Sequence, residues 1–88
     1  MEWHQFALVL TVPSDRKGEW DSLLDRAVAP NGIRFEKRHA TLLILEVQAQ
    51  MEFMAIERAT QWLQTLSEQA SPPFHIETNA QPAHEIDC

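Results

Sequence analysis

Two segments of this chain carry apolar side chains at both odd and even positions, and this feature constrains the fold more than any other. In residues 3–12, and again in residues 41–47, the side chains between the large apolar ones are mostly apolar as well. Successive side chains of a strand point to opposite faces of a sheet. A strand that is apolar on both faces is typical of the centre of a sheet, so we expect these two segments to be central strands.

Four further segments complete the expected secondary structure. Residues 15–28 and residues 51–69 repeat apolar side chains at helical spacing, and a proline-containing stretch follows each of them. Residues 33–37 and residues 74–79 alternate apolar with polar or charged side chains, which is typical of edge strands with one exposed face. The chain therefore predicts two helices and four strands.

The connection between the second and third strands allows two interpretations. The stretch 33–48 is strand-like throughout, but as one strand it would span roughly 50 Å at ~3.3 Å per residue. Strands in small domains are shorter, so we expect a hairpin that turns near residues 38–40. Because this turn lacks Gly, Asn and Pro, one bent strand in a three-stranded βαβαβ unit is the alternative.

The order strand, helix, strand, strand, helix, strand predicts an α+β domain of ferredoxin-like βαββαβ topology. This topology is a four-stranded antiparallel sheet with two helices on one face, and its first and third strands are central. A chain of 88 residues supports one such domain. We place the domain at residues 1–79 and expect the polar residues 80–88 to form a flexible tail.

Helices on one face would leave the opposite apolar face of the sheet uncovered. An apolar face of this kind is unfavourable on a monomer, so we predict a homodimer that buries it around a twofold axis. The predicted dimer-face residues are Ala7, Val9, Thr11, Leu43 and Leu45. The other register, with Leu42 and Ile44 facing outward, stays open, as does a cover formed by the tail.

The charge of the chain excludes some partners and favours others. Seven Lys and Arg against thirteen Asp and Glu give a net charge of −6, whereas nucleic-acid binding needs clustered positive charge. Residues 46–88 hold seven of the acids and one base, Arg58. We therefore favour a non-catalytic protein-interaction or regulatory domain whose acidic surface docks a basic protein or peptide. The candidate interaction residues are Arg34, Lys37, Arg38 and Phe53.

The sequence also bears on the compartment. No apolar run approaches the ~20 residues of a membrane span, and no basic start followed by an apolar segment marks a secretory signal. The single cysteine, Cys88, excludes an intrachain disulfide. We expect a cytoplasmic protein with neither a membrane nor a nucleic acid as its partner.

The first strand–helix connection carries a resemblance to a known family. Residues 15–18 read Asp-Arg-Lys-Gly after an apolar strand, and a Gly-Ile pair at 32–33 follows the helix. Over residues 6–33 this pattern resembles the opening of ACT domains, which are ferredoxin-like regulatory modules. The resemblance implies pairing of two copies and a small effector, such as an amino acid, at this loop. The effector-binding residues that it implies are Asp15, Arg16 and Gly18. Glu19 would repel an anionic effector, so effector binding is the alternative function.

No group of residues predicts catalysis. The chain has four histidines, none with a second ligand at the spacing of a metal site, and no nucleophile stands with a base. A cluster at His84, Glu85, Asp87 and Cys88 falls in the expected tail, which would not hold these side chains in place. We predict a protein that is not an enzyme and binds no cofactor or metal. A small hydrolase or isomerase that uses His39 or His75 as a base is the alternative.

Overall fold

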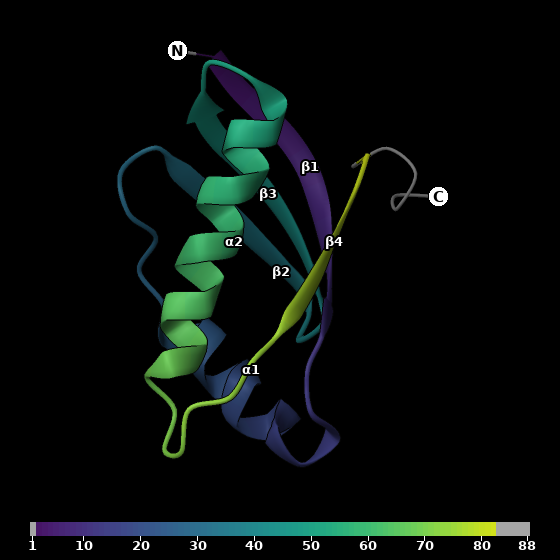
Figure 1. The fold of residues 1–88 in the computed structure, drawn as a ribbon, viewed down its shortest axis with the longest axis vertical. Helices are drawn as coiled ribbons and strands as arrows, with labels where there is room; N and C mark the ends of the chain where they lie inside the picture. The colour runs from purple at the N-terminus through teal and green to yellow at the C-terminus, as the bar shows by residue number, and fades with distance from the viewer. Residues whose placement is uncertain (1, 83–88) are drawn as a thin grey trace.

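The structure, a computed structural model, describes residues 2–82 and consists of one four-stranded antiparallel sheet and two helices (Figure 1). The elements in chain order are β1 (Glu2–Thr11), a 3-10 turn (Ser14–Arg16), α1 (Lys17–Arg26), β2 (Ile33–His39), β3 (Leu42–Ala49), α2 (Glu52–Glu68) and β4 (Glu77–Gln81). The predicted α+β class, with four antiparallel strands in one sheet and two helices, is confirmed.

The strands lie side by side in the order β2-β3-β1-β4. β1 and β3 occupy the centre, so each pairs with a neighbouring strand on both of its edges. The stretch 33–48 forms a hairpin with a register shift between Lys37 and His39, which excludes one bent strand. Thr41 in the turn remains tied to the sheet, because its carbonyl accepts the backbone N–H of Leu10 at 2.9 Å.

The register of β3 determines which apolar side chains face the helices. Leu43 and Leu45 are fully buried in the core that joins the sheet to both helices. The prediction that they line the uncovered face is therefore wrong, and Leu42 and Ile44 stand on that face, opposite residues of β1 that also face outward. Apolar side chains occupy both the odd and the even positions of β3, so the sequence pattern alone does not determine which set faces the helices. The sheet residues of the core are Phe6, Leu8, Leu10, Ile33, Leu43, Leu45, Val47 and Ala49.

The outer face of the sheet, which the helices leave uncovered, exposes less apolar surface than its sequence suggests. Ala7 and Ile44 are buried, at 0% and 6% exposure, while Val9 is 38% exposed. Thr11, at the end of β1, is exposed. Charged and amide side chains surround these residues, because the outward positions of the edge strands are polar. The outer-face residues of the edge strands are Arg34, Glu36, Glu77, Asn79 and Gln81.

α1 ends at Arg26, before the predicted end at residue 28. Ala27 already has extended backbone angles, so Val28 leaves the buried stripe and is 88% exposed. Trp20 anchors the helix to the β2–β3 turn: its ring is fully buried, and its Nε1 donates to the carbonyl of Ala40 at 2.9 Å. The helix is thereby fixed over the β2–β3 end of the sheet.

α2 lies lengthwise in front of the sheet (Figure 1) and packs its small buried side chains, Ala55 and Ala59, against the core. β4 continues to Gln81, two residues beyond the predicted strand, since Ala80 and Gln81 pair with β1. The beginning of the predicted tail therefore belongs to the sheet, and residues 83–88 lie outside the described residues. Neither helix within residues 2–82 has the length and apolarity that crossing a membrane requires.

Candidate functional site

The loop predicted to bind an effector is held by its own arginine. Arg16 Nε donates to Glu19 Oε1 at 2.9 Å, and Arg16 Nη2 donates to the same oxygen and to the carbonyl of Pro72, both at 2.5 Å. The guanidinium also lies over the ring of Phe74, with Cζ 4.7 Å from the ring centre. Only 15% of the Arg16 side chain is exposed. These contacts fasten the segment between α2 and β4 to the start of α1.

Glu19, on α1, is the acidic partner of Arg16 in this contact. The hydrogen bond from Arg16 holds the pKa of the Glu19 carboxyl below its ordinary value of 4.5, and the backbone N–H of Ser71 acts in the same direction. That N–H donates to Glu19 Oε2 at 3.3 Å. The carboxylate therefore stays ionised at neutral pH and balances the charge of Arg16.

The three effector-binding residues implied by the ACT-like resemblance, Asp15, Arg16 and Gly18, lie close together in the chain but differ in their contacts. Asp15 is exposed, and Arg16 is already matched by a carboxylate. Gly18 is exposed, and a Cβ at this position would meet nothing within 4 Å. An anionic effector at this loop would have to displace Glu19 from Arg16.

Lys37, one of the predicted interaction residues, faces the helices instead of a partner. Its Nζ donates to Asp21 Oδ1 at 2.6 Å and to Asp25 Oδ1 at 2.5 Å. These two hydrogen bonds raise the pKa of Lys37 above its ordinary value of 10.5. Lys37 therefore fastens β2 to α1.

The other predicted interaction residues lie apart from one another. Arg34 is on the outer face of the sheet, where its guanidinium stacks on Trp3 with Cζ 4.3 Å from the ring centre. Arg38 pairs with Glu36 at 3.1 Å. Phe53 is on the first turn of α2, in a different layer of the molecule. The structure therefore does not gather the four predicted residues into one surface.

Phe53 belongs to a cluster of exposed apolar side chains at the start of α2. Phe53 is 60% exposed, Met51 54% and Met54 40%. Figure 1 places this end of the helix next to the start of β1. Large apolar side chains that are exposed together are typical of interaction sites.

Three exposed carboxylates lie near this cluster in the chain or across the sheet. Glu52 and Glu57 are exposed on α2, and the exposed Glu2 pairs with Ala49, two residues before Met51. Glu57 follows Phe53 by four residues, so the two side chains share one side of the helix. We call these residues the apolar-acidic surface. It consists of Glu2, Met51, Glu52, Phe53, Met54 and Glu57.

A cleft of about 680 Å³ adjoins the apolar-acidic surface and shares Met54 and Glu57 with it. Its other lining residues are Asn31, Gly32, Gln48, Ala49, Gln50 and Arg58. Arg58 donates to the backbone carbonyls of Gln48 and Asn31, at 2.7 and 3.2 Å. This basic group beside the surface is thus tied to the backbone of β3 and of the α1–β2 connection.

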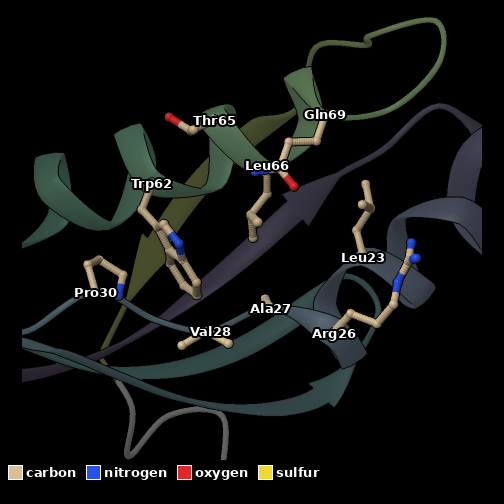
Figure 2. A pocket seen from close by; sticks show the side chains of 9 residues that line it. All are labelled: Leu23, Arg26, Ala27, Val28, Pro30, Trp62, Thr65, Leu66 and Gln69. Atoms are coloured by element: carbon tan, nitrogen blue, oxygen red, sulfur yellow. The ribbon is translucent and has the colours of Figure 1, made fainter.

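A second hollow, of about 600 Å³, lies between the end of α1 and the C-terminal half of α2, and we call it the α1–α2 groove. Its lining residues are Leu23, Arg26, Ala27, Val28, Pro30, Trp62, Thr65, Leu66 and Gln69. Figure 2 shows the Trp62 ring extending from α2 toward the segment that carries Val28 and Pro30. The Trp62 ring also packs against the ring of Phe35, with the ring centres 5.1 Å apart.

The described part of the chain contains no group of three or more His, Cys, Asp or Glu side chains arranged to hold a metal ion. His4 bonds the carbonyl of Ala49 at 3.0 Å, and His39 and His75 are exposed. The C-terminal cluster that ends in Cys88 lies outside the described residues.

Phe53 was predicted from the sequence as an interaction residue, whereas its neighbours Met51 and Met54 were not. Met51 and Met54 precede and follow it, and all three fall outside the buried stripe that begins at Ala55. The signal was available in the sequence, because three large apolar side chains off the helix stripe need a separate explanation. The α1–α2 groove left no such signal, since Trp62 fits the helical repeat of α2 and Val28 continues the helical repeat of α1, which the structure ends at Arg26.

Comparisons with known proteins add no relative: no protein-family model, curated protein or solved structure matches this chain.

Proposed function

We propose that this chain is a non-catalytic, cytoplasmic protein-interaction domain of ferredoxin-like topology, and that its apolar-acidic surface binds a basic amphipathic segment of a partner. The strand order, with β1 and β3 in the centre, supports the topology. The observation that carries the function is the joint exposure of Met51, Phe53 and Met54 at one end of α2.

The apolar part of the surface supplies the affinity in this proposal. Removing the exposed part of Phe53, Met51 and Met54 from water is worth roughly 1 kcal/mol for each side chain. Methionine adapts its shape to a partner, because its side chain is unbranched and has several rotatable bonds. An apolar patch of this kind accepts the apolar face of an amphipathic helix.

The carboxylates of the surface favour a partner with positive charge. Glu2, Glu52 and Glu57 lie near the cluster, and Arg58 beside it is bonded to two backbone carbonyls. A partner with lysine or arginine beside its apolar residues would find complementary charge here. A partner with acidic residues at those positions would be repelled.

The proposal includes a homodimer through the outer face of the sheet. The exposed apolar side chains on this face are Val9 and Trp3, at 38% and 39% exposure. Because Ala7 and Ile44 are already buried, the surface left to bury in a dimer is small, and we propose a weak association.

Binding of an effector at the first loop has less support. Arg16, the cation that would recognise an anionic effector, is matched by Glu19 and stacked on Phe74. Binding there would require this contact to open.

The experiment uses a synthetic amphipathic helical peptide of leucine and lysine as a probe, in isothermal titration calorimetry with the full chain. We expect binding that weakens as salt rises and that Phe53→Ser weakens about tenfold. Val28→Ser is the matched control, since Val28 is even more exposed, at 88%, and lies outside the surface. Equal affinity of the wild type and Phe53→Ser, or equal binding of the same peptide with glutamate in place of lysine, would overturn the proposal.

A further inference from the structure

The α1–α2 groove lies apart from the apolar-acidic surface. Leu66 in the groove is thirteen residues beyond Phe53 on the same helix, which corresponds to about 20 Å at ~1.5 Å per residue. A ligand in the groove would therefore leave the apolar-acidic surface free.

Apolar side chains form most of the groove. Leu23 comes from α1, Val28 from the segment after it, and Trp62 and Leu66 from α2 (Figure 2). Val28 is 88% exposed although the groove offers apolar neighbours. The volume of about 600 Å³ falls within the roughly 300–1,000 Å³ of small-molecule sites. Leu23 and Leu66 are already buried, so an apolar chain or ring that enters the groove would remove mainly Val28 and the half-buried Trp62 from water.

The groove has one charged lining residue, Arg26, at the end of α1. Arg26 is exposed; its Nε donates to the backbone carbonyl of Ser22 at 3.3 Å, and it forms no ion pair with a residue in 2–82. The preceding acid, Asp25, is bonded to Lys37 on the sheet. The guanidinium therefore keeps donors for a ligand at the groove.

The polar residues on the rim add little competing charge. Thr65 donates its hydroxyl to the carbonyl of Gln61 at 3.0 Å, and Figure 2 shows this oxygen pointing away from the groove. Gln69 is neutral and lines the same end of α2. Arg26 is thus a lone positive charge beside an apolar hollow in a chain whose net charge is −6.

We propose that the α1–α2 groove binds a small amphipathic carboxylate. Its apolar chain lies against Val28, Trp62 and Leu66, and its carboxylate accepts hydrogen bonds from the Arg26 guanidinium, a pairing that a planar carboxylate and a guanidinium make with two parallel bonds. A single carboxylate matches the single positive charge, and the apolar hollow disfavours a fully polar anion.

The test is a titration of the 15N-labelled full chain with decanoate below its micelle concentration, followed by the amide NMR shifts. We expect the largest shifts at the groove lining, and about tenfold weaker binding for Arg26→Gln. Decanol, which lacks the charge, should bind more weakly and be unaffected by that substitution. Lys17→Gln, at the other end of α1, is the matched control and should leave decanoate binding unchanged.

A second variant guards against an indirect effect. Val28→Asp changes an exposed side chain, so the fold should stand, and its carboxylate should repel decanoate from the groove. The proposal is overturned if decanoate shifts residues of the apolar-acidic surface instead of the groove, if Arg26→Gln binds as tightly as the wild type, or if decanol binds as well as decanoate.

Discussion

Arg16 and Glu19 form an ion pair at the start of α1, with Arg16 Nη2 2.5 Å from Glu19 Oε1. The same guanidinium reaches the carbonyl of Pro72, and the same carboxylate accepts the N–H of Ser71. The pair therefore fastens the segment between α2 and β4 to α1. The loop that resembles an effector site thus serves a structural contact in this fold.

This pair predicts a pH-dependent contribution to stability. The pKa of Glu19 is below its ordinary value of 4.5 in the folded chain, so the folded state binds this proton less tightly than the unfolded state. The contribution is present above the unfolded value and is lost as the pH falls through the lower folded value. We expect Glu19→Gln to unfold at lower urea concentration than the wild type at about pH 7, and this difference to shrink at about pH 3.

Glu68→Gln is the matched control for this prediction, because Glu68 is an exposed carboxylate of α2 that forms no ion pair within the described residues. A Glu19→Gln variant with wild-type unfolding midpoints at both pH values would show that the Arg16–Glu19 pair contributes nothing.

The two glycines should respond to alanine in opposite directions. Gly18 is in α1 and a Cβ there meets nothing within 4 Å, so Gly18→Ala should stabilise the chain by about 0.5–1 kcal/mol. Gly32 has φ +87°, and a Cβ would lie 3.1 Å from Arg58 Nη1. Gly32→Ala should therefore destabilise the chain by about 1–2 kcal/mol. Urea unfolding of both variants measures this, and destabilisation by Gly18→Ala would contradict the open surroundings of that residue.

We predict a homodimer through the outer face of the sheet. Its affinity should be micromolar or weaker, because little apolar surface beyond Val9 and Trp3 remains to be buried. Sedimentation equilibrium should show association that Val9→Lys removes, whereas Phe53→Ser should leave it unchanged. A wild-type chain that stays monomeric at millimolar concentration would rule out this dimer.

The central and edge positions of the strands could be predicted from sequence, because burial on both faces or on one face leaves a direct pattern. The orientation of β3 could not, since Leu42 to Leu45 are all apolar and either pair could face the helices. The role of Lys37 was also hidden: a base on an edge strand looks like a solvent-exposed charge until Asp21 and Asp25 of α1 are seen opposite it.

The candidate sites were less predictable than the fold. Phe53 stood out because it is a large apolar residue on the polar side of a helix, and the same argument extends to Met51 and Met54. The α1–α2 groove depends on α1 ending at Arg26, which turns Val28 outward. Because the helical repeat of apolar residues continues through residue 28, the sequence does not show that α1 ends at Arg26.

An amide NMR titration of the 15N-labelled full chain with the leucine–lysine peptide tests directly whether the apolar-acidic surface is the binding site. We expect the largest shifts on the apolar-acidic surface, at Met51, Phe53, Met54 and the neighbouring Glu57, and little change on the outer face of the sheet and in the α1–α2 groove. Shifts centred on the outer face or on the groove, with Phe53 and its neighbours unmoved, would contradict this expectation.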